Sequence, residues 1–238
     1  MTNRKISVLL LALASSTVAM AQHPAQGTIS LIPRVGVSMA SLAGEKIYIE
    51  AGNMPMSSRY KTGFMGGIDL DYQMLDNLSI SLGAYYAQQG CNYRNNSVET
   101  KGPGNTVNGT GYSDWSTNLD YLNVPLMLNV YVAPGVAVKA GLQVGFALSG
   151  KMKYTTTDYT KTPEGEYKSE KPRDVEIDMD KTLNKVNFSI PVGFSYEFSN
   201  VILDARYNIG LTSFQNIDGF ESSKNRVFTI SAGYRFAL

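Results

Sequence analysis

The sequence is poor in the side chains that most catalytic and metal sites need. Its 238 residues include one cysteine, Cys91, and one histidine, His23. A single cysteine cannot form a disulfide within the chain, so we expect Cys91 to be unpaired in a loop or at a strand end, although a free thiol could also react or pair between chains. With one histidine, a histidine-based triad is nearly excluded, and so is a recognisable zinc site. We therefore predict a protein that is not an enzyme and holds no cofactor or metal.

The sequence also lacks an excess of one charge and a long apolar run. It contains 21 Lys and Arg residues against 20 Asp and Glu residues, and this balance argues against nucleic acid as a partner. The apolar run Ile6–Ala14 is shorter than the roughly 20 residues that a membrane helix needs. Two basic residues precede it and the small-residue cleavage site Ala19–Ala21 follows. This order predicts a signal peptide over residues 1–21 and one exported domain over 22–238.

What the sequence does contain is a repeated alternation of apolar and polar residues. In the last thirteen residues, Arg226–Leu238, apolar side chains occupy every second position from Phe228 onward, which is the period of a β-strand. Seven earlier segments of about ten residues, the length of a tilted membrane strand, repeat the pattern. These segments lie near residues 29–38, 64–74, 78–88, 121–132, 136–149, 186–198 and 201–212.

The connections between these segments alternate in length. Turns of two or three residues fall at 75–77, 133–135 and 199–200. Longer polar stretches fall at 39–63, 89–120, 150–185 and 213–225. Outer-membrane barrels have this arrangement, with short turns on the periplasmic side and long loops outside the cell. The sequence therefore predicts four long extracellular loops and both termini in the periplasm.

Aromatic residues on the apolar face fall at two levels along the predicted strands. One level, near the long loops, comprises Phe64, Tyr86, Phe146, Phe188 and Phe228. The other, near the short turns, comprises Tyr72, Tyr196, Phe198, Tyr234 and Phe236. Membrane barrels carry such girdles at both interfaces. We predict an all-β fold, an eight-stranded antiparallel up-and-down transmembrane β-barrel; the alternative is a soluble lipocalin-like barrel whose apolar face points inward.

The opposite face of the strands carries small and polar residues together with eight charged ones. These are Arg34, Lys139, Arg206 and Arg235 against Asp69, Asp71, Glu197 and Asp204. Because a buried ion without a partner costs several kcal/mol, we predict an internal salt-bridge network that plugs the lumen. In it, Arg235 should lie near Asp204, Arg206 and Arg34, and both Asp69 and Asp71 should lie near Arg34. The alternative is a gated path for ions or protons.

The predicted loops hold aromatic and acidic residues that allow more than one interpretation. The aromatic residues are Tyr48, Tyr60, Tyr93, Tyr112, Trp115, Tyr154, Tyr159 and Tyr167. They form either a binding surface or contacts among the loops. Asp174–Asp180 carries four carboxylates at alternate positions, which predicts the acidic edge of a hairpin or, less simply, a weak calcium site. With Asp158, these aspartates also leave an aspartate-only protease site formally open.

Three segments resemble a known family. Tyr121–Tyr131, with the sequence YLNVPLMLNVY, resembles the "YLxIPL" strand of the PorT-like small outer-membrane barrels. Ala140–Phe146 and the closing Gly233–Phe236 resemble other recurring segments of that family. The resemblance covers essentially all of residues 22–238 and implies a monomeric, eight-stranded barrel of the OmpA transmembrane type. Members mostly lack an assigned activity, so no functional residue is carried over, and this chain departs from the usual ending by two residues after the last aromatic one.

Together these features predict a non-enzymatic outer-membrane barrel with a structural or surface-interaction role exercised through its extracellular loops. The expected partners are outer-membrane lipid, the barrel assembly machinery that recognises the C-terminal strand, and a protein or surface ligand at the loops. Two alternatives are a narrow pore for small solutes and an accessory role in an outer-membrane secretion system.

Overall fold

The segments in which apolar and polar residues alternate are strands, and they pair with one another to form a closed ring. The computed structural model describes residues 24–43, 47–49, 54–56, 58–215 and 224–238. The predicted signal peptide, residues 1–21, and His23 lie outside the described residues. No helix within the described ranges is long and apolar enough to cross a membrane.

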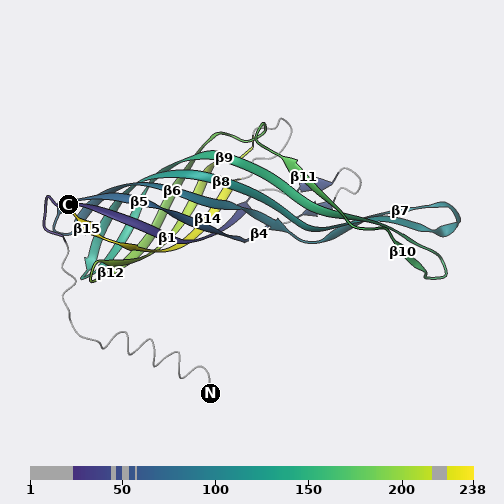
Figure 1. Ribbon diagram of the computed structural model, residues 1–238, viewed down its shortest axis with the longest axis horizontal. Coiled ribbons are helices and arrows are strands. Elements are labelled where there is room, and N and C mark those ends of the chain that lie inside the picture. The colour runs from purple at the N-terminus through teal and green to yellow at the C-terminus, as the bar shows by residue number, and fades with distance from the viewer. Residues whose placement is uncertain (1–23, 44–46, 50–53, 57, 216–223) are drawn as a thin grey trace, which may run out of the picture.

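Eight long strands, each antiparallel to its neighbours, form the ring (Figure 1). They are β1 (Ile29–Ala43), β5 (Lys61–Leu75), β6 (Leu78–Tyr93), β8 (Val107–Ala133), β9 (Val136–Lys161), β12 (Val186–Phe198), β13 (Val201–Ser213) and β14 (Lys224–Tyr234). Each strand pairs with the next long strand along the chain, and β14 returns to pair with β1, where Ile230 lies opposite Val37. The antiparallel ring agrees with the predicted fold class, and β12 has the predicted bounds.

Shorter elements complete the structure. They are β2 (Ile47–Ile49), β3 (Met54–Met56), β4 (Ser58–Arg59), β7 (Asn96–Lys101), the 3₁₀ turn η1 (Pro103–Asn105), β10 (Tyr167–Ser169), β11 (Arg173–Asp178) and β15 (Phe236–Ala237). The strands β2 and β3 form a separate hairpin, whereas β15 continues the pairing of the C-terminal segment with β1. The three short turns lie where the sequence predicted them. In the turn after β12, Ser199 and Asn200 both have positive φ, as a two-residue hairpin turn requires.

The strands β8 and β9 continue well beyond the ring (Figure 1). There β7 pairs with β8, and both β10 and β11 pair with β9. We call this sheet, residues 96–116 and 153–178, the arm. The prediction of loops over 89–120 and 150–185 was wrong in these parts. The arm strands carry polar residues on both faces, so they lack the apolar alternation by which the ring strands were recognised.

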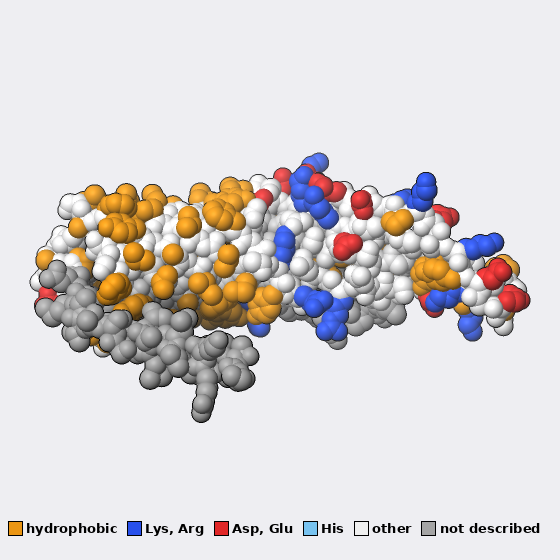
Figure 2. Space-filling model, turned by 60° about the horizontal axis from the view of Figure 1, so that its bottom comes forward, with side chains coloured by type: hydrophobic (Ala, Val, Ile, Leu, Met, Phe, Trp, Pro, Cys, Tyr) orange, Lys and Arg blue, Asp and Glu red, His pale blue; other side chains and the backbone are white. Residues whose placement is uncertain are grey.

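The apolar face of the ring strands points outward. Leu142 and Phe194 have exposed fractions of 65% and 62%, and Figure 2 shows hydrophobic side chains gathered over the ring while charged ones gather toward the arm. Phe64, Tyr72 and the other predicted girdle residues are exposed, apart from the half-buried Phe228. A soluble protein of this size rarely exposes so continuous an apolar surface. The lipocalin-like alternative, which required the apolar face to point inward, is therefore wrong.

Glycines on the inward face make room for the side chains that fill the ring. A Cβ added at Gly67 would lie 2.0 Å from the carbonyl oxygen of Ala84 and 2.7 Å from the ring of Tyr85. A larger residue at Gly67 would therefore force a shift of the neighbouring backbone of β6 as well as of the buried Tyr85 ring. Small residues on this face leave space for the large side chains beside them, and in this way a narrow ring is filled.

Candidate functional site

The eight predicted charges all lie buried inside the ring. Their exposed fractions run from 1% for Asp69 to 7% for Glu197 and Arg206. They form two groups, which we call the upper and lower ion groups. The upper group comprises Arg34, Asp69, Lys139, Asp204 and Arg206, and the lower group comprises Asp71, Glu197 and Arg235.

The upper ion group is centred on two aspartates that three cations share. Asp204 accepts hydrogen bonds from Lys139 Nζ at 2.7 Å and from Arg206 Nε at 2.6 Å. Arg34 Nε donates to Asp69 at 2.7 Å, and its Nη1 lies 3.6 Å from Asp204. A second nitrogen of Arg206 lies 3.4 Å from Asp69. The group thus carries three positive and two negative charges.

The lower ion group has the opposite balance and lies near the short turns. Arg235 donates to Glu197 at 2.8 Å and to Asp71 at 2.8 Å. Asp71 also accepts hydrogen bonds from Ser79 and Asn129. One positive charge here faces two negative ones, so the two groups together are neutral.

Arg235 does not lie beside Asp204, Arg206 and Arg34, and in this detail the sequence prediction was wrong. The Arg235 backbone N–H donates to the carbonyl oxygen of Asn200, at the turn that precedes β13. Asp204 lies further along β13, opposite Ser231. The stagger between neighbouring strands therefore sets Arg235 at the level of Glu197 rather than that of Asp204, an offset that sequence alternation does not reveal.

Amide side chains fill the ring between the upper ion group and the long connections. Gln143 donates to Asn123 at 3.2 Å, and Asn225 donates to Gln89 at 3.0 Å. Two cavities of about 30 Å³ each lie among these side chains. Cavities of that size hold single water molecules.

An apolar cluster lies at the end of the ring nearest the arm. It consists of Leu42, Cys91, Tyr93, Trp115, Leu119, Tyr121, Ala147, Met179, Leu183 and Phe214. The segment Met179–Asn184 leads into β12 between its two neighbours, β9 and β13: the Met179 N–H donates to the Gly150 carbonyl oxygen at 2.9 Å, and the Asn184 amide donates to the Ser213 carbonyl oxygen at 2.8 Å. A Cβ at Gly150 would lie 2.6 Å from Leu183, so this glycine admits the leucine. Sequence reasoning did not predict this packing, because it noted Met179 only within the acidic run Asp174–Asp180, and Leu183 stands among polar residues.

Cys91 belongs to this cluster and is fully buried as a free thiol near the end of β6. Four of the predicted loop aromatics pack at the same level. Trp115 lies 4.8 Å from Tyr154 and 5.7 Å from Tyr112, measured between ring centres, and 5.9 Å from Tyr93. These four form contacts with one another, which was one of the two interpretations of the loop aromatics. Tyr60 is exposed, and the side chain of Tyr48 lies outside the described residues.

The two faces of the arm differ. On one face, Tyr159 lies against Gly109, where a Cβ would be 2.3 Å from the tyrosine ring. Tyr159 stacks on Tyr167 at 5.2 Å and donates to Glu99 at 2.7 Å. Lys161 also donates to Glu99, and the hydrogen bonds from Lys161 and Tyr159 lower the pKa of that carboxyl. This face is filled by its own side chains.

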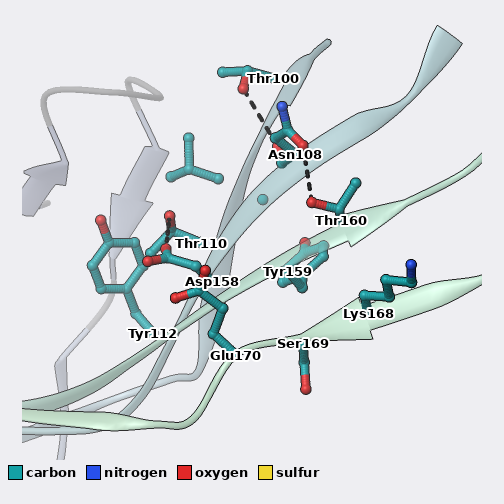
Figure 3. A pocket seen from close by; sticks show the side chains of 12 residues that line it. Thr100, Asn108, Thr110, Tyr112, Asp158, Tyr159, Thr160, Lys168, Ser169 and Glu170 are labelled. Atoms are coloured by element: carbon teal, nitrogen blue, oxygen red, sulfur yellow. Dashed lines mark hydrogen bonds between the residues drawn. The ribbon is translucent and has the colours of Figure 1, made fainter. Parts of the chain in front are cut away.

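The other face of the arm is hollowed into an open groove of about 450 Å³, which Gly109, Tyr159 and Ser169 of the first face also help to line (Figure 3). Its lining residues come from β7, β8, β9 and the β10 region. They are Val98, Thr100, Asn108, Gly109, Thr110, Tyr112, Asp158, Tyr159, Thr160, Lys168, Ser169 and Glu170. We call this the arm groove. Sequence reasoning noted Tyr112, Asp158 and Tyr159 but did not bring them together, because the groove depends on pairing between strands far apart in the chain.

The acidic residues of the predicted loop each have their own partner. Asp158 pairs with Arg173, and Asp174 accepts from Thr155. Asp178 accepts from the Asp180 N–H. The described ranges contain no group of three or more His, Cys, Asp or Glu residues arranged to hold a metal ion. The run does form the edge of a hairpin, as β11 on β9, which was the first of its two interpretations.

Comparisons with known proteins find one matching family and several similar solved structures. The model of a family described as outer membrane protein beta-barrel domain matches residues 20–216, and it does not distinguish the PorT-like group. Comparison with curated proteins finds no match. Among solved structures, the attachment invasion locus protein Ail of Yersinia pestis is 14% identical over 89% of this chain and 99% of its own, with a TM-score of 0.42. Neisserial surface protein A is 12% identical over 87% and 97%, with a TM-score of 0.39.

The outer membrane protease OmpT of Escherichia coli is 11% identical over 94% of this chain and 99% of its own, with a TM-score of 0.34. At these identities and TM-scores, none of the three similarities carries a role over to this chain.

Proposed function

We propose a role for this chain that starts from its family: the chain belongs to the outer membrane protein beta-barrel domain family. Membership of this family supports a place in the bacterial outer membrane. In our proposal the protein is a non-enzymatic barrel, closed to solutes, that anchors the arm at the cell surface for interaction with a surface ligand. Its ring spans the membrane with the short turns and both termini in the periplasm.

The apolar outer surface supports the membrane placement. Exposed Leu, Val, Ile and aromatic side chains cover the ring strands from Tyr72 near the turns to Phe64 near the arm, a span that outer-membrane lipid would cover. Beyond it, the arm is polar and charged on its surface (Figure 2). The polar arm would be costly to place in lipid, so it projects into water.

The single observation that carries the closed-barrel proposal is the filled interior. Along the ring axis, the lower ion group, the upper ion group, the amide side chains and the apolar cluster follow one another, and the cavities among the amides are about 30 Å³ each. Opening a path would separate ion pairs buried to a few per cent exposure. Breaking a buried pair costs about 3–5 kcal/mol, so thermal motion would open such a path only rarely.

Single-channel conductance of residues 22–238, refolded into a planar bilayer, tests this proposal. Folding is first checked by the difference in gel migration between unheated and boiled protein. A porin refolded in parallel serves as the positive control. We expect folded protein without steady conductance. Steady conductance from the folded chain would contradict the closed barrel and make the narrow pore the leading function.

The proposed partners follow from the same placement. Outer-membrane lipid surrounds the ring, and the barrel assembly machinery recognises the C-terminal strand, which ends with β15 on β1 and with the Leu238 N–H donating to the Ile29 carbonyl oxygen at 2.9 Å. The closed ring has no free edge to pair with a second copy, which supports a monomer.

A further inference from the structure

The arm groove is built from two rows of mostly short, polar side chains that cross neighbouring strands. Thr100, Asn108, Thr160 and Lys168 form one row, each opposite the next in the strand register. Val98, Thr110 and Asp158 form the second row. Because all of these side chains except that of Lys168 are short and the sheet is twisted, the rows enclose a trough open to solvent (Figure 3).

Hydrogen bonds between the side chains of the groove hold their polar groups in place. Thr160 donates to Asn108 Oδ1 at 3.0 Å, and Thr110 donates to Asp158 Oδ1 at 2.6 Å. Each donating hydroxyl keeps lone pairs that can accept. The Asn108 amide nitrogen and Lys168 supply donors. Donors and acceptors therefore alternate at close spacing, which is the arrangement that matches a ligand with many hydroxyl groups.

The charges at the groove are balanced, which favours a neutral ligand. Two carboxylates, Asp158 and Glu170, line it against one ammonium group, that of Lys168. Arg173 already pairs with Asp158. With Lys168 and Arg173 against these two carboxylates, the groove has no net positive charge to attract a sulfated or phosphorylated ligand, whereas the hydroxyl groups of a neutral ligand can donate to the carboxylates.

An aromatic side chain closes the end of the groove nearest the ring. Tyr112 lines the groove, and its ring is held by Trp115 at 5.7 Å and by Tyr154 at 6.1 Å. A ring fixed by its neighbours loses little side-chain entropy when a ligand packs on it. The apolar C–H face of a sugar ring suits such a surface, while its hydroxyl groups suit the threonine rows.

We propose that the arm groove binds a neutral oligosaccharide. The inference deepens the proposed function and rests on the arm being the part of the protein that meets ligands. Thr160, Asn108, Asp158 and Glu170 hydrogen-bond to sugar hydroxyl groups, and Tyr112 packs against one sugar ring.

Titration of the whole chain, residues 22–238, in lipid nanodiscs tests the proposal, since nanodiscs avoid detergents with sugar headgroups. The probes are maltohexaose, cellohexaose and mannohexaose, a heparin-derived hexasaccharide, and hexalysine. Calorimetry measures affinity. Fluorescence reports on the site, because Trp115 is the only tryptophan and packs against Tyr112. We expect at least one neutral hexasaccharide to bind and to change Trp115 emission, with the heparin hexasaccharide and hexalysine binding at least about tenfold more weakly.

Matched variants inside and outside the groove locate the site. Thr160→Val removes one groove hydroxyl without changing shape and should weaken sugar binding roughly fivefold, the effect of about one hydrogen bond. Thr157→Val makes the same change outside the groove, because Thr157 lies opposite Gly111, one position out of phase with the groove rows, and is not among the lining residues. It should leave affinity unchanged. Glu170→Gln should weaken binding while keeping the arm folded.

Several outcomes would overturn the proposal: no binding of any neutral hexasaccharide by folded protein, a preference for the heparin hexasaccharide or for hexalysine, or equal losses in Thr160→Val and Thr157→Val. Preference for hexalysine would assign the groove to a basic peptide instead. Conductance is recorded on the same preparation. A silent barrel that binds no sugar refutes only the groove, while a conducting barrel that binds sugar refutes only the closed lumen.

Discussion

At the residue scale, the direction of a side chain in a ring strand decides what surrounds it. Leu142 and Gln143 are neighbours in β9, yet Leu142 is 65% exposed on the outer surface and Gln143 donates to Asn123 inside the ring. The alternation in the sequence predicted this difference, because successive side chains of a strand point to opposite faces. Whether a side chain meets lipid or packed polar groups therefore follows from its position in the strand.

A charge on the lipid face should therefore be more damaging than the same charge one residue away. Leu142→Arg should lower the free energy of unfolding in lipid vesicles by roughly 2–4 kcal/mol, the cost of an arginine near the bilayer midplane. Gln143→Arg should mainly disturb the amide side chains of the interior. Urea titration of both variants measures the difference, and equal tolerance of the two would contradict the assigned faces.

Asp204 is the most heavily shared carboxylate of the interior. Its three cationic neighbours, Lys139, Arg206 and Arg34, lie 2.7, 2.6 and 3.6 Å away. Asp204→Asn would leave these cations with Asp69 alone, and we expect a loss of about 3–5 kcal/mol in the free energy of unfolding. The control is Glu176→Gln, which removes an exposed carboxylate from the arm and should leave global stability unchanged. Similar stabilities for the two variants would show that the upper ion group contributes little.

At the scale of elements, pairing between strands determines structure that the local sequence does not announce. The bounds of β12 were predicted correctly because its apolar residues alternate without a break. The outer halves of β8 and β9 were predicted as loops because residues such as Thr155, Thr156 and Thr157 show no apolar alternation. They are strands because Thr156 lies between Tyr112 of β8 and Arg173 of β11, and both faces meet water or other polar groups.

The attachment of β11 to β9 should depend on pH. Hydrogen bonds from Lys151 and Lys153 lower the pKa of Glu176 from its ordinary value of 4.5 to about 2. Because the pKa is lower in the folded arm, the contribution of Glu176 is fully present above about pH 4.5 and is lost as the pH falls toward about 2. Amide hydrogen exchange of β11, corrected for intrinsic rates, should show falling protection across that window. In Glu176→Gln the protection should already be low and should not change there; an unchanged wild-type protection would contradict the role of Glu176.

At the scale of the whole molecule, the arm and the short turns lie at opposite ends of the ring (Figure 1). This separation gives a direct test of orientation. Cys91 is fully buried and should not react with a maleimide that cannot cross membranes. Glu164→Cys places an exposed thiol in the arm, and Asp76→Cys places one in the turn between β5 and β6.

On intact cells, Glu164→Cys should be labelled and Asp76→Cys should be labelled only after the outer membrane is made permeable. The unsubstituted chain, which has Cys91 alone, is the control and should stay unlabelled in both conditions. Labelling of Asp76→Cys on intact cells would reverse the proposed orientation. Mass spectrometry of the purified chain measures the extent of labelling.

The sequence by itself determined the strand directions, the outward apolar surface and the burial of the eight charges, because a period of two residues assigns every ring position to one of two faces. Only the tertiary structure decided which charges meet, since the stagger between strands places Arg235 beside Glu197 and Asp71 instead of Asp204. It also decided the packing of Met179, Leu183 and Phe214 in the apolar cluster and the hollow of the arm groove. These features join residues distant in the chain, and alternation along one strand carries no information about the partner that lies across from it.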